Sequence, residues 1–269
     1  MFTAIALFTS SVLAQPGCGD IGSYLYQPSY SIDRCLRGPA VPYMPKPGDI
    51  ILVTDRSIFW KVTHIMGLAG EPHGSAIVIC RPDGTLGTLE AGPNTTFFVD
   101  ILDTLPHLQE YADKGEVWIR RRKCPLTPEE SARLTEFALQ VKDHRFALAR
   151  LGRQLTPFRT RGPLRTYFMG YPHGVRRSYF CSECVTEAMV AAGLLDRCTT
   201  RPSATYPHEL FTDTSMNLYL KHHFSLADCY DPPARWTSCP KDVIAEPCAP
   251  AVTKDAEKPT TGWIEFRSR

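Results

Sequence analysis

One stretch of the chain has the pattern expected for a reactive thiol at the start of a helix. Residues 178 to 193 read Ser-Tyr-Phe-Cys-Ser-Glu-Cys-Val-Thr-Glu-Ala-Met-Val-Ala-Ala-Gly. Apolar residues recur here at helical spacing and a glycine follows them, which predicts a helix of about three turns that begins near Ser182. Cys181 would lie at its N-terminus, where free backbone N–H groups and the helix dipole favour a thiolate and lower the cysteine pKa. Cys181 is therefore a candidate nucleophile.

Other kinds of cysteine must be weighed against this interpretation. In a chain with ten cysteines, most are disulfide partners or small buried apolar groups. Cys181 and Cys184 also form a Cys-x-x-Cys pair, but no second pair of this kind and no His pair at ligand spacing accompanies it, which disfavours zinc and redox sites. Cys184 lies on the helix side that carries Val185 and Ala188, which indicates a buried free thiol. We expect no metal and no other cofactor.

The first residues and the cysteine content both indicate an oxidising compartment. An apolar run ends in Val12-Leu13-Ala14, so we expect a signal peptide at 1–14 and a secreted or periplasmic protein. Because no Lys or Arg precedes this run, a buried N-terminal helix or a misplaced start codon stays open as an alternative. With Cys181 and Cys184 as free thiols, up to four disulfides of undefined pairing could form among Cys18, Cys35, Cys80, Cys124, Cys198, Cys229, Cys239 and Cys248.

Length and charge set only broad limits on organisation and partners. The 269 residues, 43% of them hydrophobic, suffice for one core; we expect it at 46–225, after an N-terminal arm at 15–45 and before a Cys- and Pro-rich tail at 226–269. The net charge of +2 argues for neither nucleic acid nor a membrane surface, and we expect no transmembrane segment. From His144 to Ser182 there are eight arginines and no acidic residue, which predicts either a solvated or carboxylate-paired surface or an anion-attracting rim near Cys181. The oligomeric state is not readable.

The middle of the chain alternates between β-branched runs and turns, which predicts a sheet of about five strands. These strands are expected at residues 50–54, 73–80, 85–91, about 96–102 and 116–122. Pro82-Asp83-Gly84 is a turn between the second and third of them. With a two-residue loop, His73 and Glu90 are diagonal neighbours on one face, whereas a three-residue loop would place them on opposite faces.

A second helix is expected directly after Leu126. Thr127 is its cap, Pro128 takes the first helical position, and Glu130 completes a capping box. Its buried stripe would consist of Leu134, Phe137, Ala138 and Val141. Together these elements predict an α+β fold, in which an antiparallel sheet packs against this helix and the one that follows Cys181.

Four motifs in a fixed order carry a resemblance to a known family. They are Gly48-Asp49-Ile50-Ile51, His73-Gly74-Ser75-Ala76-Ile77-Val78, Leu89-Glu90-Ala91 and Tyr179-Phe180-Cys181-Ser182-Glu183. In this order the chain resembles the circularly permuted papain-like cysteine hydrolases, and among them the NlpC-type, YiiX-like branch, over roughly residues 45 to 215. In ordinary NlpC-type peptidases the cysteine helix precedes the strands, whereas here the histidine comes first. The resemblance implies a permuted papain-like fold.

The same resemblance implies a Cys-His-Glu triad. Cys181 would be the nucleophile, His73 the general base and then acid, and Glu90 the group that orients the imidazole, while Tyr179 would assist substrate or oxyanion binding. The implied activity is that of a secreted thiol hydrolase, which cleaves an amide bond in a peptide or cell-wall peptide. Two alternatives stay open: a lipid acyl hydrolase or acyltransferase similar to lecithin:retinol acyltransferase, and a binding module without turnover.

Overall fold

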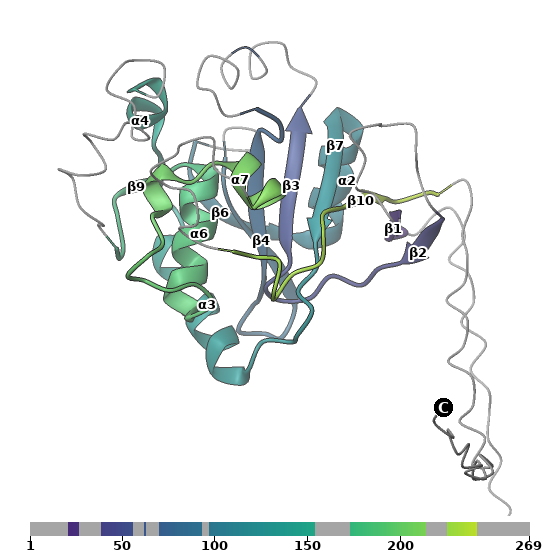
Figure 1. Ribbon diagram of the computed structural model, residues 1–269, viewed down its shortest axis with the longest axis horizontal. Coiled ribbons are helices and arrows are strands. Elements are labelled where there is room, and N and C mark those ends of the chain that lie inside the picture. The colour runs from purple at the N-terminus through teal and green to yellow at the C-terminus, as the bar shows by residue number, and fades with distance from the viewer. Residues whose placement is uncertain are drawn as a thin grey trace, which may run out of the picture.

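The computed structural model describes residues 21–26, 39–55, 62, 70–92, 97–153, 173–213 and 225–240 (Figure 1). In chain order its elements are β1 (Tyr24–Tyr26), β2 (Ala40–Pro42), β3 (Ile50–Asp55), β4 (Gly74–Cys80), β5 (Leu86–Ala91), β6 (Val99–Asp103), α2 (Thr104–Lys114), β7 (Gly115–Arg120), α3 (Pro128–Val141), β8 (Arg145–Phe146), α4 (Leu148–Arg153), β9 (Ser178–Tyr179), α6 (Cys181–Ala192), η1 (Pro202–Ala204), α7 (Pro207–Thr212) and β10 (Ala234–Thr237). The expected signal peptide at 1–14 lies outside the described residues.

The predicted combination of helices with an antiparallel sheet is confirmed, but the main sheet is larger than predicted. It has eight strands in the order β2-β1-β10-β7-β3-β4-β5-β6, and every neighbouring pair is antiparallel. The five predicted strands lie next to one another as β7-β3-β4-β5-β6, with β6 at the edge of the sheet. The other three come from the expected arm and tail, and they are only three or four residues long. Strands this short carry too little alternation to be seen in a sequence.

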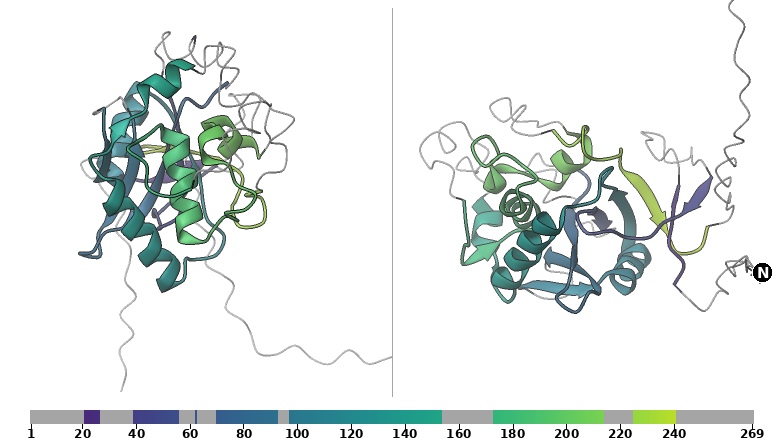
Figure 2. Two further views of the ribbon diagram at one scale, coloured as in Figure 1. Left: turned by 90° about the vertical axis from the view of Figure 1, so that its left-hand side faces the viewer. Right: turned by 90° about the horizontal axis from the view of Figure 1, so that it is seen from below.

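Helices cover both faces of the sheet. On one face, α3 and α6 lie beside each other (Figures 1 and 2) and bury a core with β3 residues Ile50 and Leu52 and β4 residues Ile77 and Ile79. On the other face, α2 packs its own apolar side chains against the remaining residues of the same strands. The alternation of side chains along each strand therefore decides which core a residue joins.

The two predicted helices are confirmed. Helix α3 begins at Pro128, with Thr127 and Glu130 forming the capping box, and the predicted stripe of four apolar residues is buried. Helix α6 begins at Cys181, one residue before the predicted start, and ends at Gly193, whose φ of 81° is the left-handed conformation that glycine adopts without strain. Helix α2 was not predicted.

The β4–β5 hairpin has a three-residue loop and not the two-residue loop on which the predicted contact between His73 and Glu90 depends. Arg81 N donates to Thr85 O at 2.8 Å, so the loop has three residues, and Ala76 pairs with Glu90. Since directly paired residues share a face of the sheet, Glu90 lies on the face of Ala76.

Candidate active site

The first turn of α6 is held in place by polar contacts on both sides of Cys181. Phe180 N donates to the Glu183 carboxylate at 3.4 Å, and the Ser182 hydroxyl donates to Thr205 O at 2.7 Å. The following turn buries Cys184 in the core beneath the helix, where it is a free thiol as predicted. Cys181 is thus the first residue of a firmly anchored helix.

The structure brings Cys181 against the beginning of β4. Its sulfur lies 3.9 Å from the backbone oxygen of His73, and the backbone N–H groups of Ser182 and Ser75 both donate to this sulfur. His73 precedes the strand directly, its N–H donates to Val53 O at 2.9 Å, and only 8% of its surface is exposed. Two sequence-predicted site residues, 108 positions apart, therefore meet at one end of the sheet.

Burial has the largest effect on the Cys181 thiol. It raises the pKa to about 11, and the charge of Glu90 acts in the same direction. The hydrogen bonds from Ser182 and Ser75 lower the pKa but do not compensate for the loss of water around the sulfur. The sequence-based expectation of a lowered pKa was therefore wrong for this arrangement: near neutral pH Cys181 is a protonated thiol, although it begins a helix.

Glu90 has partners on α2, and its predicted role in orienting the His73 ring stays a prediction. On the α2 face its carboxylate contacts the His107 ring and accepts a hydrogen bond from the Tyr111 hydroxyl, and all three side chains are buried. The His107 and Tyr111 rings meet edge to face, with centroids 4.6 Å apart. The sequence analysis missed this cluster because it predicted no helix at α2; the i, i+4 spacing of His107 and Tyr111 was the one available signal.

Tyr179 is part of the core rather than of a substrate surface. The residue is fully buried, and its ring meets Phe137 edge to face, with centroids 6.1 Å apart. Its hydroxyl accepts from Arg176 N at 2.7 Å and donates to Gly174 O at 3.3 Å. The turn before β9 thus engages the hydroxyl, and the predicted role of Tyr179 in substrate or oxyanion binding stays a prediction.

Two of the eight arginines between His144 and Ser182 pair with a carboxylate. Arg150 and Arg176 lie 2.6 Å and 2.8 Å from the same oxygen of Glu183, which is 1% exposed. Burial raises the pKa of Glu183, and the two guanidinium groups oppose that change. The carboxylate-paired alternative therefore holds for Arg150 and Arg176; Arg159, Arg161 and Arg165 lie outside the described residues.

The cysteines that the structure describes form no disulfide with one another. Cys80, Cys124, Cys198, Cys229 and Cys239 are free, in contrast to the expected disulfides among them, and Cys18, Cys35 and Cys248 lie outside the described residues. Within the described ranges, no three His, Cys, Asp or Glu side chains are grouped so that they could hold a metal ion. The helices in these ranges are too short or too polar to cross a membrane.

Comparison with solved structures yields weak structural similarity. No family model matches the chain, and no curated protein matches it. Among solved structures, the chain is similar to the crystal structure of metalloprotein yiiX from Escherichia coli O157:H7, with 18% sequence identity and a TM-score of 0.39 over 56% of this chain and 67% of that chain. A similarity at this level does not show that the two proteins share a family.

Proposed function

We propose that the chain is a thiol hydrolase of permuted papain-like fold that cleaves an amide bond in a peptide or cell-wall peptide. The observation that carries the proposal is the distance of 3.9 Å between the sulfur of Cys181 and the backbone of His73. A thiol at the start of a helix, beside a histidine from another element, has the two groups that nucleophilic catalysis needs. The order of the sequence motifs, histidine before cysteine, supports the same assignment.

In the proposed reaction, His73 accepts the thiol proton of Cys181 as the sulfur attacks the acyl carbon. The imidazolium then donates this proton to the leaving amine, and the C–N bond breaks to leave a thioester. Water, deprotonated by His73, attacks the thioester, which releases the carboxylic acid and restores the Cys181 thiol. We assign the backbone N–H of Cys181, in the first turn of α6, as a donor to the acyl oxygen.

The proposed pair works without Glu90. Because burial raises the pKa of Cys181 to about 11, the resting thiol is neutral, and His73 removes its proton during the attack rather than beforehand. Glu90 is held by His107 and Tyr111 on the α2 face. Replacement of Glu90 should therefore change turnover by changing the stability of the fold, and not by changing the orientation of the His73 ring.

Incubation of the full chain with muropeptides, followed by mass spectrometry of the fragments, tests the proposal. Cys181→Ala and His73→Ala should each reduce turnover by about 100-fold or more, since each removes a group that the chemical step needs. Cys184→Ala is the matched control, because it removes a thiol from the same helix, and Glu90→Gln should retain activity as long as the protein stays folded. Unchanged turnover in Cys181→Ala would refute the proposal.

A binding module without turnover is the second candidate, and the raised pKa of Cys181 and the separation of Glu90 from His73 favour it. Saturable binding of muropeptides by a wild-type chain that leaves both muropeptides and phospholipid vesicles intact would support this candidate. Release of fatty acid from the vesicles would instead indicate a lipid acyl hydrolase.

A further inference from the structure

A cationic cavity lies at the other end of β3 from the candidate active site. Val53, near the end of β3, pairs with Gly74 beside His73, whereas Ile50 at its beginning pairs with Ile77 and Arg120. The cavity opens next to this beginning and has a volume of about 460 Å³. Its charged lining consists of Lys46, Asp49, Arg121, Arg122, Lys123 and Asp231. Four cationic side chains against two carboxyl groups leave an excess of positive charge.

Neither carboxyl group of the cavity lining forms an ion pair with Lys46. Asp49 is 1% exposed, and its oxygens accept hydrogen bonds from the Tyr43 hydroxyl at 2.8 Å, the Lys46 N–H at 3.0 Å and the Arg122 N–H at 2.8 Å. Burial raises the pKa of Asp49, so this carboxyl group holds its proton to a higher pH than usual. Asp231 pairs with Arg121 instead, at 3.1 Å. In the described part of the chain, the Lys46 ammonium has no ion-pair partner.

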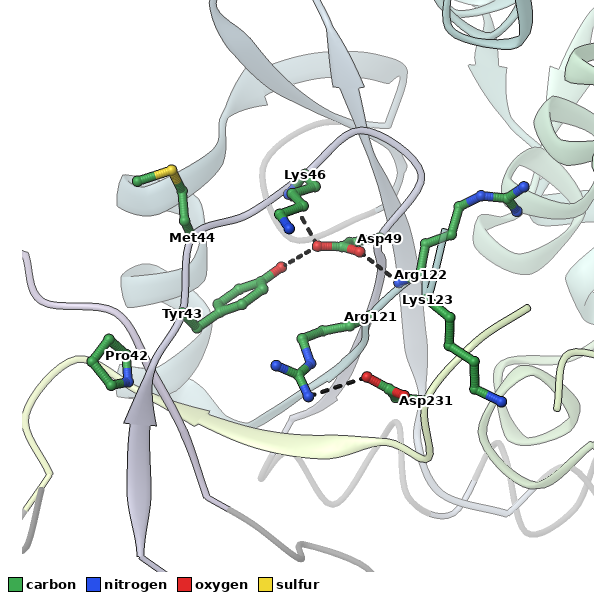
Figure 3. Close-up of a pocket in the computed structure, with 9 residues that line it drawn as sticks. All are labelled: Pro42, Tyr43, Met44, Lys46, Asp49, Arg121, Arg122, Lys123 and Asp231. Carbon is green, nitrogen blue, oxygen red and sulfur yellow. Dashed lines mark hydrogen bonds and ion pairs between the residues drawn. The ribbon is translucent and has the colours of Figure 1, made fainter. Parts of the chain in front are cut away.

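Arg121 also has unused hydrogen-bonding capacity. Only its Nη2 contacts Asp231, while its Nε is buried and has no hydrogen-bond acceptor among the described residues. A buried N–H of a guanidinium group without an acceptor is unfavourable, and an anion in the cavity would relieve this cost. Figure 3 shows Lys46 and Arg121 on the same side of Asp49 as the Tyr43 ring, whereas Arg122 and Lys123 extend away from that ring.

We propose that this cavity binds the phosphate group of a small soluble molecule, with Lys46 and Arg121 as its two ligands. A guanidinium edge and an ammonium group on separate elements suit the several acceptor oxygens of a phosphate. The volume exceeds that of a single phosphate and lies within the range of small-molecule pockets, roughly 300–1,000 Å³. Pro42 and the 77% exposed Met44 also border the cavity and offer an apolar surface to the rest of the ligand.

Isothermal titration calorimetry of the full chain with phenyl phosphate, inorganic phosphate and benzoate tests the proposal. Phenyl phosphate should bind once per chain and more tightly than the other two, because it alone has both the phosphate and an apolar part. Its affinity should fall about tenfold or more in Lys46→Met and in Arg121→Met, each of which removes one charged donor. Lys142→Met is the matched control, because Lys142 is exposed at the end of α3 and lies outside the cavity. This variant should bind phenyl phosphate as tightly as wild type does.

Three results would overturn the proposal: no binding of phenyl phosphate, equal affinity in wild type and in both cavity variants, or tighter binding of benzoate. Vesicles that contain phosphatidic acid distinguish a lipid headgroup from a soluble ligand, and binding to these vesicles without binding of phenyl phosphate would also overturn it. Lys46 is exposed, so Lys46→Met should fold, and Arg121→Lys, which keeps the charge, should retain more affinity than Arg121→Met.

Discussion

The Cys181 thiol should react with iodoacetamide much more slowly than free cysteine at neutral pH. Burial raises its pKa to about 11, compared with about 8.5 for an ordinary cysteine, and only the thiolate reacts. Well below both values, the thiolate fraction falls tenfold for each pKa unit, so Cys181 should carry roughly 300-fold less thiolate than free cysteine at pH 7. The logarithm of the alkylation rate should rise with pH at a slope near one from pH 6 to pH 10.

Tandem mass spectrometry of the tryptic peptide measures this rate separately for Cys181 and Cys184. Cys184 is fully buried, so its labelling would report unfolding rather than thiolate formation, and thermal denaturation at each pH provides a second check. His73→Ala should leave the profile unchanged, because burial and not a charged imidazole sets the pKa. A plateau in the rate between pH 6 and pH 8 would refute the reasoning, since it would mean that the helix N-terminus and His73 outweigh burial.

Two further predictions concern the ion pairs of Arg120 and Arg121 and the buried carboxyl group of Glu183. Arg120→Ala should lower the free energy of unfolding in urea by about 3–5 kcal/mol, because it leaves Asp213, with which Arg120 pairs at 2.7 Å and 3.0 Å, without its partner. Arg121→Ala should lower the free energy of unfolding by only about 0–1 kcal/mol, because the ion pair that it removes has side chains that are 32% and 35% exposed. Equal losses of stability in the two variants would contradict this reasoning. Glu183 has a raised pKa in the folded state, so its contribution to stability is present below the unfolded pKa of about 4.3 and is lost as the pH rises through the folded value. The stability of wild type relative to Glu183→Gln should thus fall as the pH rises above about 4.3 and become constant above the folded pKa, and a difference that does not change with pH would argue against it.

Local patterns were sufficient for the central elements of the fold. The capping box at Thr127 and Glu130 and the apolar stripe of α3 depend on residues three or four positions apart, and they are present as predicted. The end of α6 at Gly193 likewise follows from one residue. Helix α2 escaped prediction because much of its surface is polar, so packing against β5 and β7 stabilises it more than local propensity does.

The face of a strand residue could not be predicted with the same certainty. One additional residue in the turn after Arg81 reverses the faces of β4 relative to β5, and the sequence Pro-Asp-Gly is compatible with both loop lengths. Glu90 accordingly shares the face of Ala76 and contacts His107 and Tyr111. The same limit applies to Tyr179, whose hydroxyl is directed by the turn that precedes β9.

The sequence by itself determined that Cys181 begins a helix and that the central strands precede it, because helix caps and strand alternation are short-range properties. Only the tertiary structure decided that Cys181 lies against the backbone of His73, that Glu90 contacts His107 and Tyr111, and that burial raises the pKa of the thiol. Each of these depends on how distant segments pack and exclude water. A pKa in particular reflects the solvent that the whole fold removes, which no local pattern records.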